Sequence, residues 1–176
     1  MKGKCILYIA SSVDGYIAKP NDNLDFLNLV AQEGEDYGYG QFYEQIDTVI
    51  LGKRTYDWVM GQVSDFPHQG KETYVLTRQI LNPIGTVQFY SGELLDLVSR
   101  LKHKQGKNIF IDGGAQTVYR FLEKGLLDEL IISFIPVLLG EGIRLFQEGF
   151  FEQKLELISS QSYPSGLVQV HYRVVR

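Results

Sequence analysis

One stretch in the second half of the chain, residues 107–119, limits the possible folds more than any other. It reads K-N-I-F-I-D-G-G-A-Q-T-V-Y, an apolar run that ends in two glycines and continues into a helical pattern. The run from Asn108 to Ile111 does not alternate between polar and apolar residues, which is typical of a strand buried on both faces of a sheet. The stretch therefore predicts a strand, a tight turn and a helix, as in an α/β fold.

The two glycines at this turn have two possible roles. Gly113 and Gly114 carry no Cβ, so a phosphate could approach the backbone closely, and the N–H groups that open the helix from Ala115 would point towards it. The alternative is a tight turn that binds nothing. A lone glycine pair does not decide between an anion site and a simple turn.

Two earlier apolar runs, residues 48–51 and 73–76, also lead into polar and basic residues. The residues that follow them are Gly52, Lys53, Arg54 and Thr55 in the first case, and Thr77 and Arg78 in the second. If all three strands are parallel, their ends lie along one edge of the sheet, where open α/β folds bind ligands. The sequence thus predicts a phosphate-lined crevice at that edge.

Composition excludes several classes of function. With 176 residues, 44% hydrophobic and 22% charged, the chain is predicted to form a single globular domain over residues 1–176. A net charge of -4 argues against a general affinity for nucleic acid. No stretch approaches the length that spans a membrane, and the single Cys5 lies in an apolar run, so we expect a cytoplasmic protein with a buried thiol.

The remaining patterns predict the other elements. Ser91 is expected to cap the helix whose buried face includes Leu94 to Leu101, Gly125 to end the helix that starts at Ala115, and Pro136 to mark a bend, a bulge or an edge. Strands are expected over 5–10, 48–51, 73–77, 86–90, 130–139, 154–162 and 167–176, and amphipathic helical segments over 24–30, 42–46 and 55–60. The last two strands should form an antiparallel hairpin.

The three histidines do not indicate a metal site. His68, His103 and His171 are expected in a loop, at a helix end and on an outer strand face, without a carboxylate or cysteine at ligand spacing. We therefore expect no metal cofactor.

Five motifs in order resemble the dihydrofolate reductase-like superfamily, and most closely its riboflavin-biosynthesis branch, the RibD C-terminal domain. They are S-V-D-G-Y-I-A at 12–18, V-I-L-G-K-R-T-Y at 49–56, Y-V-L-T-R at 74–78, I-D-G-G-A-Q at 111–116 and P-V-L-L-G-E-G-I-R-L-F at 136–146. The resemblance implies a three-layer α/β/α fold with a central, mixed but mostly parallel sheet. It also implies NADPH as cofactor, hydride transfer to a C=N or C=O bond of a heterocyclic or sugar-derived substrate, and a homodimer.

The resemblance assigns cofactor contacts residue by residue. The adenosine 2′-phosphate is expected at Thr77 and Arg78, and arginine there suits a phosphate better than a free ribose hydroxyl. The other expected cofactor-binding residues are Ala10, Gly52, Lys53, Arg54, Thr55, Gly113, Gly114, Ala115 and Gln116.

Two carboxylates are candidates for catalysis. The resemblance places Asp14 beside the nicotinamide, although Asp14-Gly15 also fits a tight turn. Asp25 occupies roughly the region of the carboxylate that holds the pterin in dihydrofolate reductases, without the flanking pattern. The D-x-P segment of the riboflavin reductases is absent after residue 56, and so is the G-x-G-x-x-G of an ordinary dinucleotide fold.

Three functions are therefore open. The first is a reductase that resembles 5-amino-6-(5-phosphoribosylamino)uracil reductase. The second is a dihydrofolate or pteridine reductase, and the third is a module that binds NADP(H) without catalysis.

Overall fold

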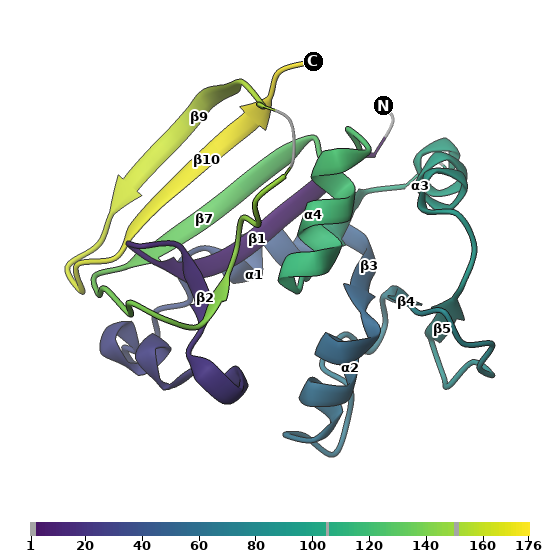
Figure 1. The fold of residues 1–176 in the computed structure, drawn as a ribbon, viewed down its shortest axis with the longest axis horizontal. Coiled ribbons are helices and arrows are strands. Elements are labelled where there is room, and N and C mark those ends of the chain that lie inside the picture. Colours follow the sequence, from purple (N-terminus) through teal and green to yellow (C-terminus); the bar gives the residue numbers. More distant parts are fainter. Residues whose placement is uncertain (1–2, 105, 150–151) are drawn as a thin grey trace.

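The computed structural model describes residues 3–104, 106–149 and 152–176. Within these residues, one eight-stranded sheet has the order β5-β4-β3-β6-β1-β7-β10-β9, and β2 and β8 form a small second sheet (Figure 1). The strands are β1 (Cys5–Ser12), β2 (Tyr16–Ala18), β3 (Ile46–Gly52), β4 (Glu72–Leu76), β5 (Val87–Tyr90), β6 (Asn108–Ile111), β7 (Glu129–Ile135), β8 (Ile143–Arg144), β9 (Leu155–Ser162) and β10 (Val168–Val174). The helices are η1 (Pro20–Asp22), η2 (Asp25–Val30), α1 (Tyr39–Glu44), α2 (Lys53–Met60), α3 (Leu94–His103) and α4 (Ala115–Glu123), of which η1 and η2 are 3-10 helices.

The direction of the strands confirms the predicted architecture. Neighbouring strands from β5 to β7 are parallel, whereas β10 runs antiparallel to both β7 and β9. The sheet is therefore mixed but mostly parallel, and the C-terminal pair is the expected antiparallel hairpin.

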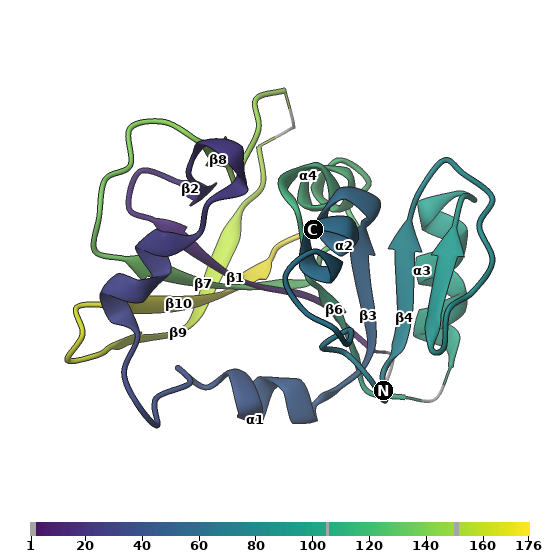
Figure 2. The same cartoon turned by 90° about the horizontal axis from the view of Figure 1, so that it is seen from below.

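The central strands are buried on both faces because helices cover each side. Along β6, Ile109 and Ile111 belong to the core under α3 and α4, and Phe110 between them belongs to the core under α1 and α2. Figure 2 shows α4 and α1 on opposite sides of β1. This three-layer arrangement explains why the strand sequences are continuous apolar runs.

Helix α4 ends as the sequence predicts. Gly125 has a φ of 60°, the Gly125 N–H bonds to the Leu122 carbonyl at 3.0 Å, and the Leu126 N–H bonds to the Phe121 carbonyl at 2.8 Å. These two bonds are the Schellman pattern, in which a left-handed glycine satisfies the last carbonyl groups of a helix.

The predicted start of α3 is wrong. The helix begins at Leu94 with Glu93 in the capping position, and no side chain caps it. The Tyr90 hydroxyl donates a hydrogen bond to the Glu93 carbonyl at 3.1 Å, and Gly92 lies against the Tyr90 ring. Because these contacts accompany an extended backbone at Glu93, Ser91 lies outside the first helical turn.

Three other boundaries differ from the sequence analysis. Residues 25–30 form a 3-10 helix, and Ile46 opens β3 instead of continuing the helix that ends at Glu44. The strand expected over 130–139 ends at Ile135, because Pro136 has no N–H for the ladder.

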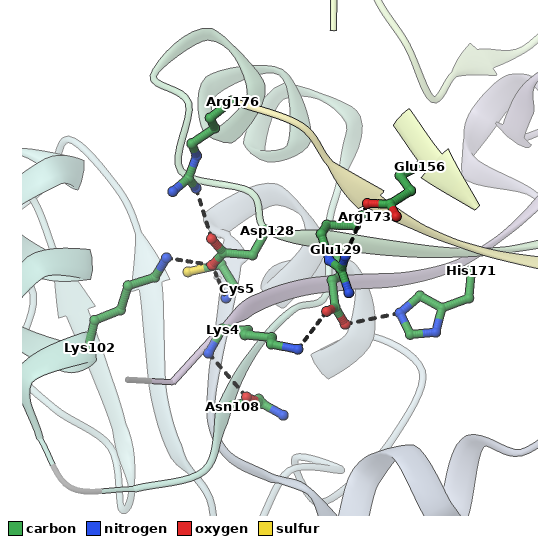
Figure 3. A network of polar contacts seen from close by, with 10 residues as sticks. All are labelled: Lys4, Cys5, Lys102, Asn108, Asp128, Glu129, Glu156, His171, Arg173 and Arg176. Atoms are coloured by element: carbon green, nitrogen blue, oxygen red, sulfur yellow. Dashed lines mark hydrogen bonds and ion pairs between the residues drawn. The ribbon is translucent and has the colours of Figure 1, made fainter. Parts of the chain in front are cut away.

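A polar network fastens both ends of the chain to the start of β7 (Figure 3). The Asp128 carboxylate accepts a hydrogen bond from the Cys5 N–H at 2.8 Å, pairs with Arg176 at 2.8 Å and also pairs with Lys102. Cys5 itself is buried, and this burial raises the pKa of its thiol to about 12. The expectation of a buried, unreactive thiol is confirmed.

The first residue of β7 is a buried carboxylate with two partners. Glu129 pairs with Lys4 at 2.6 Å and with His171 at 3.0 Å, and 6% of its side chain is exposed. The pair between Arg173 and Glu156 lies nearby but has more than half of each side chain exposed. The ion pairs of the buried Glu129 are therefore the stronger candidates for a contribution to stability.

No helix in the described part of the chain is both long and apolar enough to cross a membrane.

Candidate functional site

The three predicted strand ends lie side by side at one edge of the sheet. β3 pairs with both β4 and β6, and all three run parallel. At their carboxyl ends, the Gly52 N–H bonds to the Gly113 carbonyl at 3.0 Å, and the Asp112 N–H bonds to the Ile50 carbonyl at 3.0 Å. The turns after β3 and β6 are thus joined directly.

The two turns pack so closely that a larger residue would crowd a threonine side chain at both. A Cβ on Gly52 would lie 2.9 Å from Thr117 Oγ1, and one on Gly114 would lie 3.1 Å from Thr55 Oγ1. The Gly114 N–H also donates to Thr55 Oγ1 at 2.9 Å, and the Gly113–Gly114 peptide bond is cis. Neighbouring Gly113 has a φ of 93°, a conformation that suits glycine.

Helices α2 and α4 begin at these glycines, so their N-termini meet at the same edge. Gly52 and Gly114 occupy the two capping positions, and neither helix has a side-chain cap. First-turn N–H groups and the positive ends of two helix dipoles are therefore directed at one region, which favours an anion.

The two basic residues in the first turn of α2 already form ion pairs within the protein. Lys53 pairs with Asp57 at 2.6 Å, and Arg54 pairs with Asp22 at 2.9 Å with 77% of its side chain exposed. Gln116, in the first turn of α4, is exposed. The structure thus brings Gly52, Thr55, Gly113, Gly114 and Ala115 together and leaves the longer side chains at the margin.

The end of β4 carries the third group of predicted residues. The Thr77 N–H bonds to the Tyr90 carbonyl at 3.0 Å, and its hydroxyl accepts from the Gln79 N–H at 3.1 Å. Arg78 is exposed, and the described residues offer it neither an ion pair nor a hydrogen bond. Its guanidinium group is therefore available to a phosphate.

A cavity of about 210 Å³ lies beside Ala10, near the end of β1. Its walls come from β1, η2, β7 and the residues around Tyr37 and Leu167. On one side, Gln169 Nε2 lies 3.0 Å from the Tyr8 hydroxyl and 3.0 Å from Ser133 Oγ. Burial raises the pKa of Tyr8 to about 12, so its phenol stays neutral at physiological pH.

A larger hollow of about 740 Å³ lies at the opposite, amino end of the strands and is open to solvent. Its two lysines are already engaged: Lys71 Nζ donates to the Ile46 carbonyl at 2.7 Å, and Lys107 Nζ donates to the Glu44 carbonyl at 2.5 Å. The smaller cavity, near the carboxyl end of β1, is therefore the better candidate for a ligand site.

Asp14 is held by the neighbouring loops. Its carboxylate accepts from the Ser12 hydroxyl at 2.6 Å, the Gly140 N–H at 2.7 Å and the Leu139 N–H at 3.1 Å. These bonds, that of Ser12 first, lower the pKa of Asp14 to about 2. The geometry agrees with the turn interpretation of Asp14-Gly15.

Asp25, the other catalytic candidate, lies at the first position of η2. Its carboxylate pairs with Lys19 at 2.7 Å, 55% of its side chain is exposed, and it does not line the cavity.

The sequence analysis missed a buried cluster next to the Gly113–Gly114 turn. His68 has 5% of its side chain exposed and lies 3.0 Å from Asp112 and 3.1 Å from the Tyr43 hydroxyl. The His68–Asp112 pair joins residues 44 positions apart, so no local spacing could indicate it. Within the described residues, no group of three or more histidine, cysteine or acidic side chains is arranged to hold a metal.

Comparisons with known proteins agree with this geometry. The chain matches the RibD C-terminal domain over residues 4–169. It is 41% identical to the uncharacterized protein YwjB of Bacillus subtilis (strain 168), over 98% of each chain. It is 31% identical to the uncharacterized protein YyaP of the same organism, over 96% of this chain and 94% of that one.

Solved structures show the same fold. A Shewanella sp. PV-4 protein provisionally assigned to riboflavin biosynthesis superposes with a TM-score of 0.89 and 32% identity over the whole of both chains. A diaminohydroxyphosphoribosylaminopyrimidine deaminase/5-amino-6-(5-phosphoribosylamino)uracil reductase from Thermotoga maritima superposes with a TM-score of 0.73. That match, at 12% identity, covers 99% of this chain and 57% of the longer one.

Proposed function

Because the chain belongs to the RibD C-terminal domain family, we propose that it is an NADPH-dependent reductase that acts on a C=N or C=O bond of a small heterocyclic or sugar-derived substrate. The resemblance stated from the sequence is confirmed at the level of family and fold. One observation carries the proposal: two uncapped helix N-termini and Arg78, which pairs with none of the described residues, lie along the edge of the sheet that also holds the cavity.

The donors at this edge fit a phosphorylated dinucleotide. The backbone N–H groups at the Gly52 and Gly114 turns would hold the pyrophosphate, and Arg78 with Thr77 would hold the 2′-phosphate. Ala10 is small enough to leave room for a flat ring against β1. NADPH, when bound, supplies the hydride, and the protein contributes orientation and exclusion of water.

The cavity favours a substrate that places a single heterocyclic ring in it. Its volume of about 210 Å³ is below the range of about 300–1,000 Å³ that is usual for drug-sized ligands. Tyr8 and Ser133, which Gln169 holds from behind, give one wall hydrogen-bonding groups, as a heterocycle with ring nitrogens requires. We therefore prefer a substrate like the aminouracil of the Thermotoga maritima enzyme. Dihydrofolate fits less well, because Asp25, the carboxylate expected to hold its pterin, does not line the cavity.

The test has two stages. We expect saturable enhancement or quenching of NADPH fluorescence, followed by NADPH oxidation with 5-amino-6-(5-phosphoribosylamino)uracil at an ordinary rate, with kcat on the order of 1–10³ s⁻¹. The same assay with dihydrofolate, pteridines and small carbonyl compounds provides the comparison. Absence of NADPH binding at high micromolar concentration would rule out an NADPH-dependent reductase.

A second candidate is an NADP(H)-binding protein without turnover. It is favoured by Asp14, whose carboxylate is fully engaged by Ser12 and two backbone N–H groups. Tight binding of NADPH combined with no oxidation by the whole substrate panel would select this candidate.

We also propose that two copies pair through the exposed end of the sheet. β9 is an edge strand exposed along its whole length, with 54% of Leu157 and 41% of Ile158 accessible. An unpaired edge with apolar side chains favours association. Sedimentation should give the mass of a dimer at micromolar concentration, and a monomer would contradict the proposal.

A further inference from the structure

Tyr43, His68 and Asp112 form a chain of hydrogen-bonded side chains that leads to the Gly113–Gly114 turn. The Tyr43 hydroxyl on α1 lies 3.1 Å from His68 Nδ1, and His68 Nε2 lies 3.0 Å from Asp112 Oδ2. The imidazole is buried against the rings of Phe66 and Phe110, with centroid distances of 5.2 and 5.8 Å. Packing against these rings and hydrogen bonds at both ring nitrogens thus fix the orientation of the imidazole.

The direction of these bonds follows from the chemistry of the partners. An ionised carboxylate only accepts hydrogen bonds, so Nε2 of His68 must carry the hydrogen that is shared with Asp112. In a neutral imidazole Nδ1 is then an acceptor, and the Tyr43 hydroxyl is its donor. One tautomer therefore satisfies all three groups.

Asp112 follows the last residue of β6 and immediately precedes the Gly113–Gly114 turn. Its side chain follows Phe110 on the face covered by α1 and α2, with 27% exposed. Oδ2 is engaged by His68, whereas Oδ1 has no partner among the described residues. A free, partly desolvated carboxylate oxygen thus lies beside the turn proposed to hold the cofactor.

The surroundings connect this oxygen to the cavity. The Tyr39 ring packs against Phe110 of β6 with a centroid distance of 6.3 Å, and burial and then the negative charge of Asp112 raise the pKa of Tyr39. The Tyr39 ring contacts the Tyr8 ring at 5.5 Å, and Tyr8 lines the cavity. Lys71 lies over the Tyr43 ring at 4.6 Å and does not pair with Asp112.

We propose that His68 is a positioning residue, which holds Asp112 through Oδ2 so that Oδ1 accepts a hydrogen bond from an N–H group of a nitrogen heterocycle bound at the strand ends. The part that concerns the ligand depends on the proposed function. Without the imidazole donor, the partly exposed carboxylate would turn towards water.

Two substitutions separate hydrogen bonding from packing. His68→Phe fills the aromatic surroundings but has no donor, whereas His68→Gln keeps an N–H that can reach Asp112. The matched control is His171→Phe, which removes another imidazole–carboxylate pair of 3.0 Å at the amino end of the strands.

The first measurement is nitrogen-15 NMR of the whole protein. We expect the His68 ring to be the Nε2–H tautomer with a slowly exchanging proton, and we expect that proton to exchange rapidly in Asp112→Ala. Hydrogen on Nδ1 alone would overturn the proposal. This result does not depend on activity.

The second measurement is the affinity for 5,6-diaminouracil at saturating NADP⁺, by calorimetry. We expect His68→Phe to weaken binding about 10- to 100-fold, as for a lost hydrogen bond to a charged group, and we expect His68→Gln to recover most of the loss. His171→Phe should bind as the wild type does. NADP⁺ affinity should be unchanged in all three variants.

The outcomes separate the two proposals. Equal diaminouracil affinity in His68→Phe and wild type, or NADP⁺ binding without any diaminouracil binding, would overturn the role of His68. Failure of the wild type to bind NADP⁺ would instead overturn the proposed function, and the NMR result would then decide alone whether His68 holds Asp112.

Discussion

The close packing between the N-termini of α2 and α4 allows a quantitative prediction of how a substitution at Gly52 changes stability. A Cβ at this position would lie 2.9 Å from Thr117 Oγ1, which belongs to a buried side chain of α4. Overpacking of this kind costs about 1–3 kcal/mol. The φ of Gly52 is -80°, so alanine is tolerated by the backbone and should recover about 0.4–1 kcal/mol through the unfolded state. We expect Gly52→Ala to destabilise the protein by about 1–2 kcal/mol.

The origin of this cost can be tested with a double-mutant cycle. Thr117→Ala removes the contacting atom, so Gly52→Ala should be neutral or slightly stabilising on that background. Thr117→Val keeps an atom in the same place and is the control on which the cost should persist. Urea unfolding followed by the fluorescence of Trp58, the only tryptophan and a residue of α2, gives the four free energies. A coupling below about 0.3 kcal/mol would refute the steric explanation.

Three further predictions concern charged residues. Arg78→Ala should weaken NADPH binding by about 1.5–3 kcal/mol and leave NADH almost unchanged in fluorescence titrations, whereas equal losses would exclude Arg78 as the selective residue. Glu129→Gln should lower the free energy of unfolding by about 1–3 kcal/mol in urea titrations. Glu156→Gln should lower it by less than about 1 kcal/mol, because more than half of each side chain in its ion pair is exposed. Similar losses in the two variants would contradict the importance of burial. The pKa of Asp14 is lowered from 3.8 to about 2, so the folded state gains stability above pH 4 that it loses as the pH falls towards 2. The stability gap between wild type and Asp14→Asn should therefore close over that interval in acid titrations, and a constant gap would show that the ionised carboxylate is not responsible.

Local sequence patterns predicted the elements that form the edge of the sheet proposed to bind the cofactor. The strand ends at Gly52, Thr77 and Gly113 were found because each follows an apolar run directly, and the α/β rule places such ends together. Gly125 was recognised for a similar reason, since a left-handed glycine is a local requirement.

Features that depend on distant contacts were not predictable in this way. The burial of His68 depends on aromatic residues from β6, α1 and its own loop, and its pairing with Asp112 is set only when the sheet is complete. The start of α3 was misjudged because the Tyr90 ring, rather than the Ser91 side chain, determines the local conformation. Capping propensity gave way there to a side-chain contact between residues three positions apart.

The position of β1 in the middle of the sheet has a consequence for synthesis of the chain. Its ladder partners are β6 and β7, which begin at Asn108 and Glu129, so the first strand to be translated waits for more than half of the protein before it can pair. Contacts this far apart in sequence slow folding and leave unpaired apolar segments exposed. We expect ribosome-bound chains that end before residue 108 to hold β1 as an unpaired apolar segment that chaperones recognise.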